Sequence, residues 1–155
     1  MKKNFFILCI VSVALCFLGC NAKDPITSTT SKDPNAVDLG LPSGNLWKNV
    51  DESSVAGLSF ENVEQYQKDG WSVPTKSDFE ELLSTCLFEP GSNGARVVGP
   101  NGNSIVLKNG RYLSSTIYDY DSYLVYCLWI GSSSGIENAH YSFYSYNIRL
   151  VKHVK

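Results

Sequence analysis

Residues 70–86 read GWSVPTKSDFEELLSTC, and this stretch determines more of the fold than any other part of the chain. A residue that precedes proline favours extended backbone, so Trp71–Val73, ahead of Pro74, is predicted to form a short strand. Thr75 can accept a hydrogen bond from the amide of Asp78, as a helix N-cap does. After this cap, an apolar stripe with the spacing i, i+3, i+4 and i+7 predicts a helix that faces the core: Phe79, Leu82, Leu83 and Cys86.

A second helix and a series of strands flank this stretch. Ser59–Lys68 is predicted to be helical, with Ser59 as its N-cap and Gly70 as a left-handed residue beyond its end. Asn101-Gly102 indicates a hairpin turn, and Gly131–Gly135 indicates a flexible connection. The predicted strands are Arg96–Val98, Ser104–Leu107, Tyr112–Thr116, Tyr123–Ile130, which is apolar on both faces, and Tyr141–Val154. Two helices followed by antiparallel strands predict an α+β domain.

The N-terminus has the features of a lipoprotein signal peptide. Two lysines precede an apolar stretch, Phe5–Leu18, that is too short to span a bilayer comfortably as a helix. It ends at Gly19 and Cys20 in a segment that resembles a bacterial lipobox, except that Phe17 stands where leucine is preferred. We therefore predict a signal peptide over residues 1–19 and a lipid on Cys20. The alternative is an ordinary secretory signal with a cysteine there by chance.

The segment 20–36 is rich in Ser, Thr, Pro and charge, so it is predicted to be a flexible tether, and residues 37–155 are predicted to form the folded domain. Lys23-Asp24 resembles the charged export signal of surface lipoproteins. We expect the chain in the cell envelope, held by its lipid in the outer membrane of a Gram-negative bacterium, with a periplasmic and an outward orientation both left open. Cleavage of the signal peptide would remove two lysines, and the mature chain contains no run of basic residues. This composition argues against nucleic acid as a partner.

The cysteines leave two alternatives open. Cys9 and Cys16 lie in the leader and Cys20 would carry the lipid, so Cys86 and Cys127 remain in the predicted domain. In an oxidising compartment these two can form a disulfide. The alternative is a pair of buried thiols that pack as small apolar side chains.

Five segments, in order, resemble a family of bacterial surface domains, the Fibrobacter succinogenes major paralogous domain: Val37–Trp47, Gly70–Cys86, Val98–Ile105, Tyr112–Thr116 and Tyr146–Val151. The resemblance implies a C-type-lectin-like domain, with two helices packed on antiparallel strands. It also implies that the N- and C-terminal strands pair, which would bring Leu46-Trp47 close to Ile148–Leu150. The segment between Trp47 and Gly70 is shorter than in many family members.

No catalytic residue, metal site or cofactor is predicted. The Trp71–Glu80 segment also resembles sulfatase-modifying enzymes, which need a C-terminal pair of cysteines to bind copper, whereas Cys127 stands alone there. His140 and His153 are too few for the histidine cluster of the iron-dependent relatives, and we interpret both as surface residues. Glu89-Pro90-Gly91 imitates a calcium-binding motif but has glycine where an oxygen-bearing side chain belongs.

Tyrosines gather between residues 112 and 147, interleaved with Ser, Asp and Asn, a composition typical of recognition surfaces. The alternative is that they fill the core of the sheet, which we favour for Tyr123 and Tyr126. The predicted ligand-binding residues are Tyr118, Tyr120, Asp121 and Tyr141.

Three functional hypotheses follow from these patterns. The first is a non-catalytic binding module that recognises a glycan or a protein without calcium. The second is a structural or fimbria-associated surface subunit, whose tyrosines pack against a partner. The third is a degenerate enzyme of the sulfatase-modifying type.

Overall fold

The structure is a computed structural model that describes residues 33–55, 60–142 and 144–154. The chain divides into two units, Met1–Thr30 and Ser31–Lys155. The signal peptide, Cys20 and most of the predicted tether lie outside the described residues. Asp33, near the end of that tether, accepts a hydrogen bond from the indole Nε1 of Trp71 at 2.9 Å. The packed unit therefore includes residues that precede the predicted domain boundary at residue 37.

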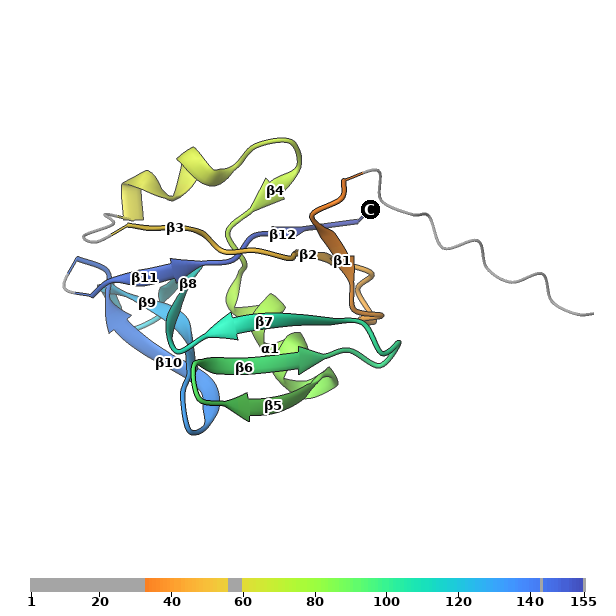
Figure 1. Cartoon of the computed structure of the whole chain (residues 1–155). Coiled ribbons are helices and arrows are strands. Elements are labelled where there is room, and N and C mark those ends of the chain that lie inside the picture. The colour runs from red at the N-terminus through yellow and green to blue at the C-terminus, as the bar shows by residue number, and fades with distance from the viewer. Residues whose placement is uncertain (1–32, 56–59, 143, 155) are drawn as a thin grey trace, which may run out of the picture. The chain divides into compact units, whose positions relative to one another are not determined.

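The described residues form three sheets, one α-helix and one 3-10 helix (Figure 1). The four-stranded sheet has the order β1 (Ala36–Asp38), β2 (Leu46–Lys48), β12 (Val151–Lys152), β4 (Trp71–Ser72). The five-stranded sheet has the order β10 (Ser134–His140), β9 (Asp121–Ile130), β8 (Gly110–Tyr118), β11 (Tyr146–Ile148), β3 (Glu52–Val55). The third sheet has the order β5 (Leu87–Gly91), β6 (Gly94–Val98), β7 (Ser104–Lys108). The helices are α1 (Lys76–Thr85) and η1 (Phe60–Tyr66).

Residues 70–86 adopt the predicted structure. Thr75 is the N-cap of α1, and its side chain accepts a hydrogen bond from the amide of Asp78 at 3.2 Å, while the Asp78 carboxylate accepts one from the Thr75 amide at 2.8 Å. This reciprocal capping box satisfies two backbone donors at the helix start. Phe79 and Leu82 are fully buried in the first core, and Leu83 and Cys86 pack at its edge.

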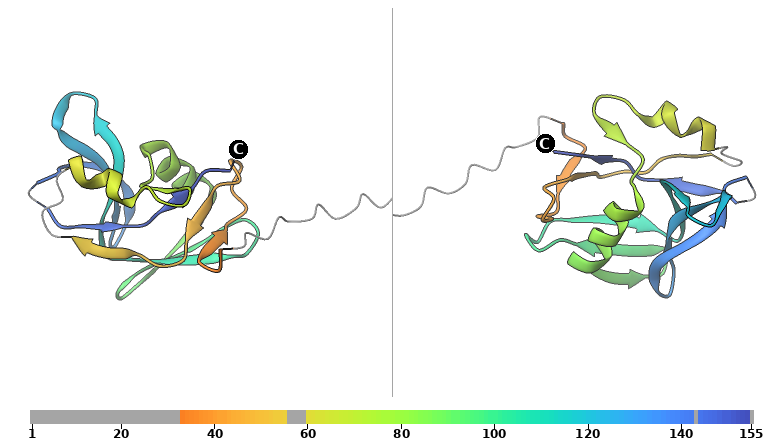
Figure 2. Two further views of the ribbon diagram at one scale, coloured as in Figure 1. Left: turned by 90° about the horizontal axis from the view of Figure 1, so that it is seen from above. Right: turned by 180° about the vertical axis from the view of Figure 1, so that it is seen from behind.

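The core has two parts, and β9 contributes to both of them. The first part lies between α1 and the β5–β6–β7 sheet, one face of which α1 covers (Figures 1 and 2), and it includes Leu128 and Ile130 of β9. The second part contains Val125 and Cys127, together with Trp71. Because successive strand residues point to opposite faces, β9 is buried on both sides. The prediction of a doubly buried strand here is confirmed.

The predicted fold class, a C-type-lectin-like α+β domain with two helices packed on the strands, is wrong. The described residues are mostly strand and contain a single α-helix. In place of the helix predicted over Ser59–Lys68 stands the short η1. The helical pattern misled because Asp69-Gly70 is a hairpin signal, with φ of 56° and 81°, that pairs Lys68 with Trp71.

Strands from the two ends of the domain do pair, as predicted. Val151 of β12 lies opposite Trp47 of β2 in an antiparallel ladder. The long closing strand predicted over Tyr141–Val154 is wrong, however. The chain forms β11 in the five-stranded sheet, leaves it at Arg149-Leu150, and enters the four-stranded sheet as β12.

A buried arginine is found where the chain changes sheet. The side chain of Arg149 is 2% exposed and lies 2.7 Å from the Asp51 carboxylate, which is 7% exposed. Its guanidinium also donates hydrogen bonds to the carbonyl oxygens of Lys48 at 2.7 Å and Val106 at 2.6 Å. Asp51 in turn accepts a hydrogen bond from the hydroxyl of Tyr112 at 3.2 Å. Since these partners belong to or adjoin β2, β7 and β8, the network joins all three sheets.

Candidate functional site at the β8–β9 hairpin

The hairpin formed by β8 and β9 carries the predicted ligand-binding residues Tyr118, Tyr120 and Asp121. Tyr118 pairs with Asp121, so Asp119 and Tyr120 form the turn between the strands. The Asp121 carboxylate accepts a hydrogen bond from the amide of Tyr123 at 2.9 Å, which fixes the first residues of β9. The end of the hairpin projects beyond the strands around it (Figure 2). Tyr120, at this end, is 87% exposed.

Four side chains meet at this end, and we call them the hairpin cluster: Tyr118, Tyr120, Tyr126 and Lys76. The ring of Tyr118 makes edge-to-face contacts with the rings of Tyr120 and Tyr126, at centroid distances of 5.4 and 5.3 Å. The ammonium of Lys76 lies 4.2 Å from the centre of the Tyr126 ring. Such contacts are worth about 0.5–1.5 kcal/mol per aromatic pair beyond area burial. The exposed Tyr120 therefore stands on a supported base.

Tyr126 anchors the cluster to the turn. Its side chain is buried, and its hydroxyl donates a hydrogen bond to the Asp119 carboxylate at 2.8 Å. This hydrogen bond, together with burial, raises the pKa of Tyr126. The phenol therefore remains a neutral donor that fixes Asp119 at the turn. The interpretation of Tyr126 as a core residue is confirmed, although its contact with Tyr118 also makes it part of the site.

Tyr141, the fourth predicted residue, belongs to a different group. It packs against the second core, and its ring lies 5.3 Å from that of His140, which in turn stacks on Tyr123 at 6.0 Å. Tyr123 is 61% exposed, so its interpretation as a core residue is wrong. Its carbonyl still accepts a hydrogen bond from the Tyr141 amide at 3.3 Å, so the backbone of Tyr123 is paired while its side chain faces solvent. The structure therefore separates Tyr141 from the hairpin cluster.

Sequence reasoning missed Lys76 and Asp119. Lys76 belongs to α1, forty-two positions before Tyr118, and its amide donates a hydrogen bond to the hydroxyl of Thr116 at 3.0 Å. Only the packing of α1 against β8 brings it to the hairpin. Asp119 could have been found from the sequence, because it precedes Tyr120 in a loop already identified.

Cys86 and Cys127 are both free thiols in the structure, and they belong to different parts of the core. Cys127 is fully buried in the second core, and Cys86 is half-buried at the edge of the first. Burial raises the pKa of Cys127 to about 12 and that of Cys86 to about 11, with smaller contributions from Glu137 and Glu81 respectively. Neither thiol is an activated nucleophile, because the thiolate is the reactive form.

The Cys127 thiol makes stability depend on pH in the alkaline range. In the unfolded chain it ionises near its usual pKa of about 8.5, whereas in the folded chain it keeps its proton. Between pH 9 and 11 the unfolded state therefore binds fewer protons, and stability falls by about 1.4 kcal/mol per pH unit from this thiol alone. Urea unfolding at several pH values would measure the slope. Cys127→Ala should be less stable near neutral pH but should show a shallower alkaline slope, and equal slopes would contradict this prediction.

Within the described ranges, no three His, Cys, Asp or Glu side chains converge as metal ligands would. His153 is a surface residue with a partner, because its Nε2 lies 3.1 Å from both carboxylate oxygens of Asp78 at the start of α1. No helix in the described part of the chain is long and apolar enough to cross a membrane.

Comparisons of the chain with protein-family models, with characterised proteins and with solved structures found no match. The resemblance to the Fibrobacter succinogenes major paralogous domain therefore stays a prediction from the sequence.

Proposed function

We propose that this chain is an envelope lipoprotein that binds a glycan, without calcium, through the hairpin cluster. The observation that carries the proposal is the exposure of Tyr120 on a base of packed aromatic rings. Tyrosines interleaved with serine and aspartate in a loop are typical of recognition surfaces, because the ring supplies a large contact area. Tyrosine also loses little conformational entropy on binding, because its side chain has only two torsions.

The groups around Tyr120 favour a carbohydrate over other ligands. A sugar ring can lay its apolar C–H face on the exposed ring and donate hydroxyl hydrogen bonds to the carboxylates of Asp119 and Asp121. These carboxylates repel phosphate, which disfavours nucleic acids. The cation nearby, Lys76, lies over the Tyr126 ring and 3.5 Å from the Glu80 carboxylate, so it already has an acidic partner.

The proposed anchor is a lipid on Cys20, with a tether between it and the packed unit that begins near Asp33. On this proposal the lipid holds the chain in the outer membrane and the tether lets the hairpin cluster reach glycans outside the cell. Labelling of intact cells with an antibody against the domain tests the outward orientation, with lysed cells as the positive control. Signal from lysed cells alone would contradict surface exposure.

A glycan array tests the proposal. The full-length chain is solubilised in a detergent that lacks a sugar headgroup and is applied with and without a chelator. We expect a glycan signal that the chelator does not change, and a loss of about tenfold in affinity for Tyr120→Ala, as for a central interface aromatic. Val106→Ala is the matched control, because Val106 is also an exposed large side chain but belongs to β7.

Loss of the signal with chelator would contradict calcium independence, and equal binding by Tyr120→Ala and the parent chain would remove the hairpin cluster from the site. Absence of binding to every glycan on the array would favour a structural or fimbria-associated subunit, in which the same tyrosines pack against a protein.

A further inference from the structure

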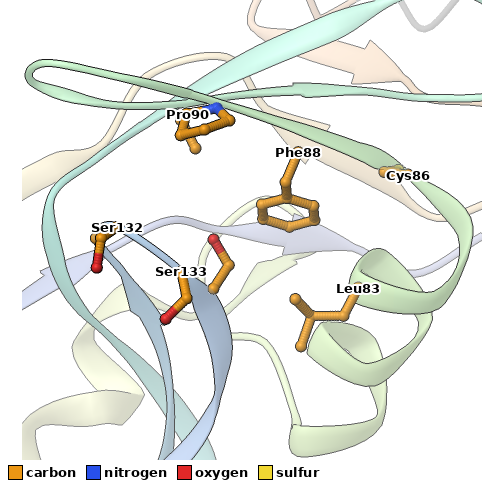
Figure 3. Close-up of a pocket in the computed structure, with 9 residues that line it drawn as sticks. Leu83, Cys86, Phe88, Pro90, Ser132 and Ser133 are labelled. Carbon is orange, nitrogen blue, oxygen red and sulfur yellow. The ribbon is translucent and has the colours of Figure 1, made fainter.

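We infer that a second cavity, at the other end of β9 from the hairpin cluster, binds one uncharged sugar residue. It has a volume of about 320 Å³ and lies between the last turn of α1, strand β5 and the turn that joins β9 to β10 (Figure 3). Because β9 spans ten residues at about 3.3 Å each, some 30 Å separates this cavity from Tyr120. The inference therefore does not rest on the hairpin cluster.

One wall of the cavity is apolar. Leu83 comes from α1, and Phe88 and Pro90 come from β5, whose inner face lies on the first core. Figure 3 shows Leu83 and the ring of Phe88 facing the turn that carries Ser132 and Ser133. Because Leu83 and Phe88 also pack on the first core, they are held in place without a ligand.

The opposite side of the cavity is formed by three serines of the turn, Ser132, Ser133 and Ser134, of which Ser132 and Ser133 are exposed. None of the three makes a side-chain hydrogen bond to any other described residue. The turn itself is fixed, because the Gly131 amide donates to the Ser133 carbonyl at 3.1 Å. A Cβ on Gly131 would lie 2.9 Å from the ring of Trp129, so this close approach requires glycine. The Gly131–Ser133 hydrogen bond closes the turn, and the exposed serines at it are open to a ligand in the cavity.

The lining carries no charge. Among the described residues that line the cavity, only Cys86 can titrate, and burial raises the pKa of its thiol to about 11, so it is neutral at physiological pH. An ionised ligand would give up hydration with no opposite charge to meet. A ligand that fits this cavity is neutral. It has one apolar face that can contact Phe88 and a set of hydroxyl groups that can hydrogen-bond to the serines, and an uncharged pyranose has both. The volume is at the lower end of small-molecule sites, about 300–1,000 Å³.

Cys86 provides a reporter within the cavity wall, and the fully buried Cys127 provides an internal control. The full-length chain, in a detergent without a sugar headgroup, is treated with iodoacetamide at mildly alkaline pH, and mass spectrometry of peptides follows both thiols. The probes are the methyl glycosides of glucose, galactose and mannose, N-acetylglucosamine, glucuronate as the charged analogue, and cyclohexanol as a ring of similar size with one hydroxyl.

We expect at least one neutral sugar to slow the labelling of Cys86 by about sixfold at a concentration five times its Kd, with Cys127 unchanged. The double variant Ser132→Ala, Ser133→Ala should need about tenfold more sugar for the same protection, because it loses two hydrogen bonds. Ser122 is an exposed serine at the far end of β9, so Ser122→Ala should show the same sugar protection as the parent chain. Unchanged slow labelling of Cys127 verifies that each variant is folded.

Four results would overturn the inference. The first is an absence of protection by every neutral sugar. The second is protection by cyclohexanol alone, which would assign the cavity to an apolar group. The third is equal protection by glucuronate, which would mean that neutrality does not select the ligand. The fourth is equal protection in the double serine variant, which would mean that the hydroxyls do not select it. Tyr120→Ala should leave protection intact, so failure here is distinguishable from failure of the hairpin cluster.

Discussion

Replacement of Arg149 by alanine is expected to lower the free energy of unfolding by about 3–5 kcal/mol, the usual cost of removing one partner of a buried ion pair. The Asp51 carboxylate would remain buried without its cation, and the carbonyls of Lys48 and Val106 would lose their donor. Because these partners connect three sheets, the loss affects the whole domain. Guanidinium unfolding of the chain without residues 1–20 would measure it.

Arg96 supplies the matched control for this experiment. Its guanidinium lies 2.8 Å from the Glu89 carboxylate, but about half of each side chain is exposed. Exposed ion pairs contribute about 0–1 kcal/mol, so Arg96→Ala should change stability little. Arg149→Lys keeps the charge but cannot reach three acceptors at once, and it should fall between the parent and the alanine variant. Similar costs for Arg96→Ala and Arg149→Ala would contradict the role of the buried network.

Replacement of Phe79 by alanine is the second large effect, with an expected cost of about 3–5 kcal/mol. Phe79 is fully buried, and its ring stacks on Trp47 of β2 at a centroid distance of 5.9 Å. The substitution therefore leaves a cavity at the contact between α1 and the N-terminal strands. The denaturation midpoint should fall with the slope unchanged, as it does when stability alone changes.

Glu80→Ala is the control on the same helix. Glu80 is exposed and lies 3.5 Å from Lys76 in a surface pair, so its removal should cost about 0.5 kcal/mol or less. A cost for Phe79→Ala no larger than that for Glu80→Ala would mean that α1 does not hold the first core together.

The sequence predicted best where local chemistry and packing agree. Residues 70–86 contain a proline, a cap and a periodic stripe that all require the same strand and helix, and the structure has both. The hairpin around Gly99–Asn103 was predicted for the same reason, and β6 and β7 pair across it with Val98 opposite Ser104. Gly99 is required there, because a Cβ would lie 1.9 Å from the carbonyl oxygen of Leu39.

The errors arose where long-range contacts override local pattern. Nothing in the residues around Arg149 indicates that it is buried, and only its distant partner Asp51 explains its burial where the chain changes sheet. Strand β10 was missed because its residues are mostly polar, and its pairing with β9 supplies what its composition lacks. Similarly, Lys76 reaches the hairpin cluster through the packing of α1, which no pattern near Tyr120 encodes.

The central claim is that the hairpin cluster binds a glycan without calcium. The most direct test is a titration of the isotope-labelled chain with the strongest glycan from the array, in excess chelator, with amide chemical shifts recorded throughout. The account predicts that the shifts concentrate at Lys76 and at residues 117–123. Shifts confined to residues 131–134, or no shifts until calcium is restored, would contradict it.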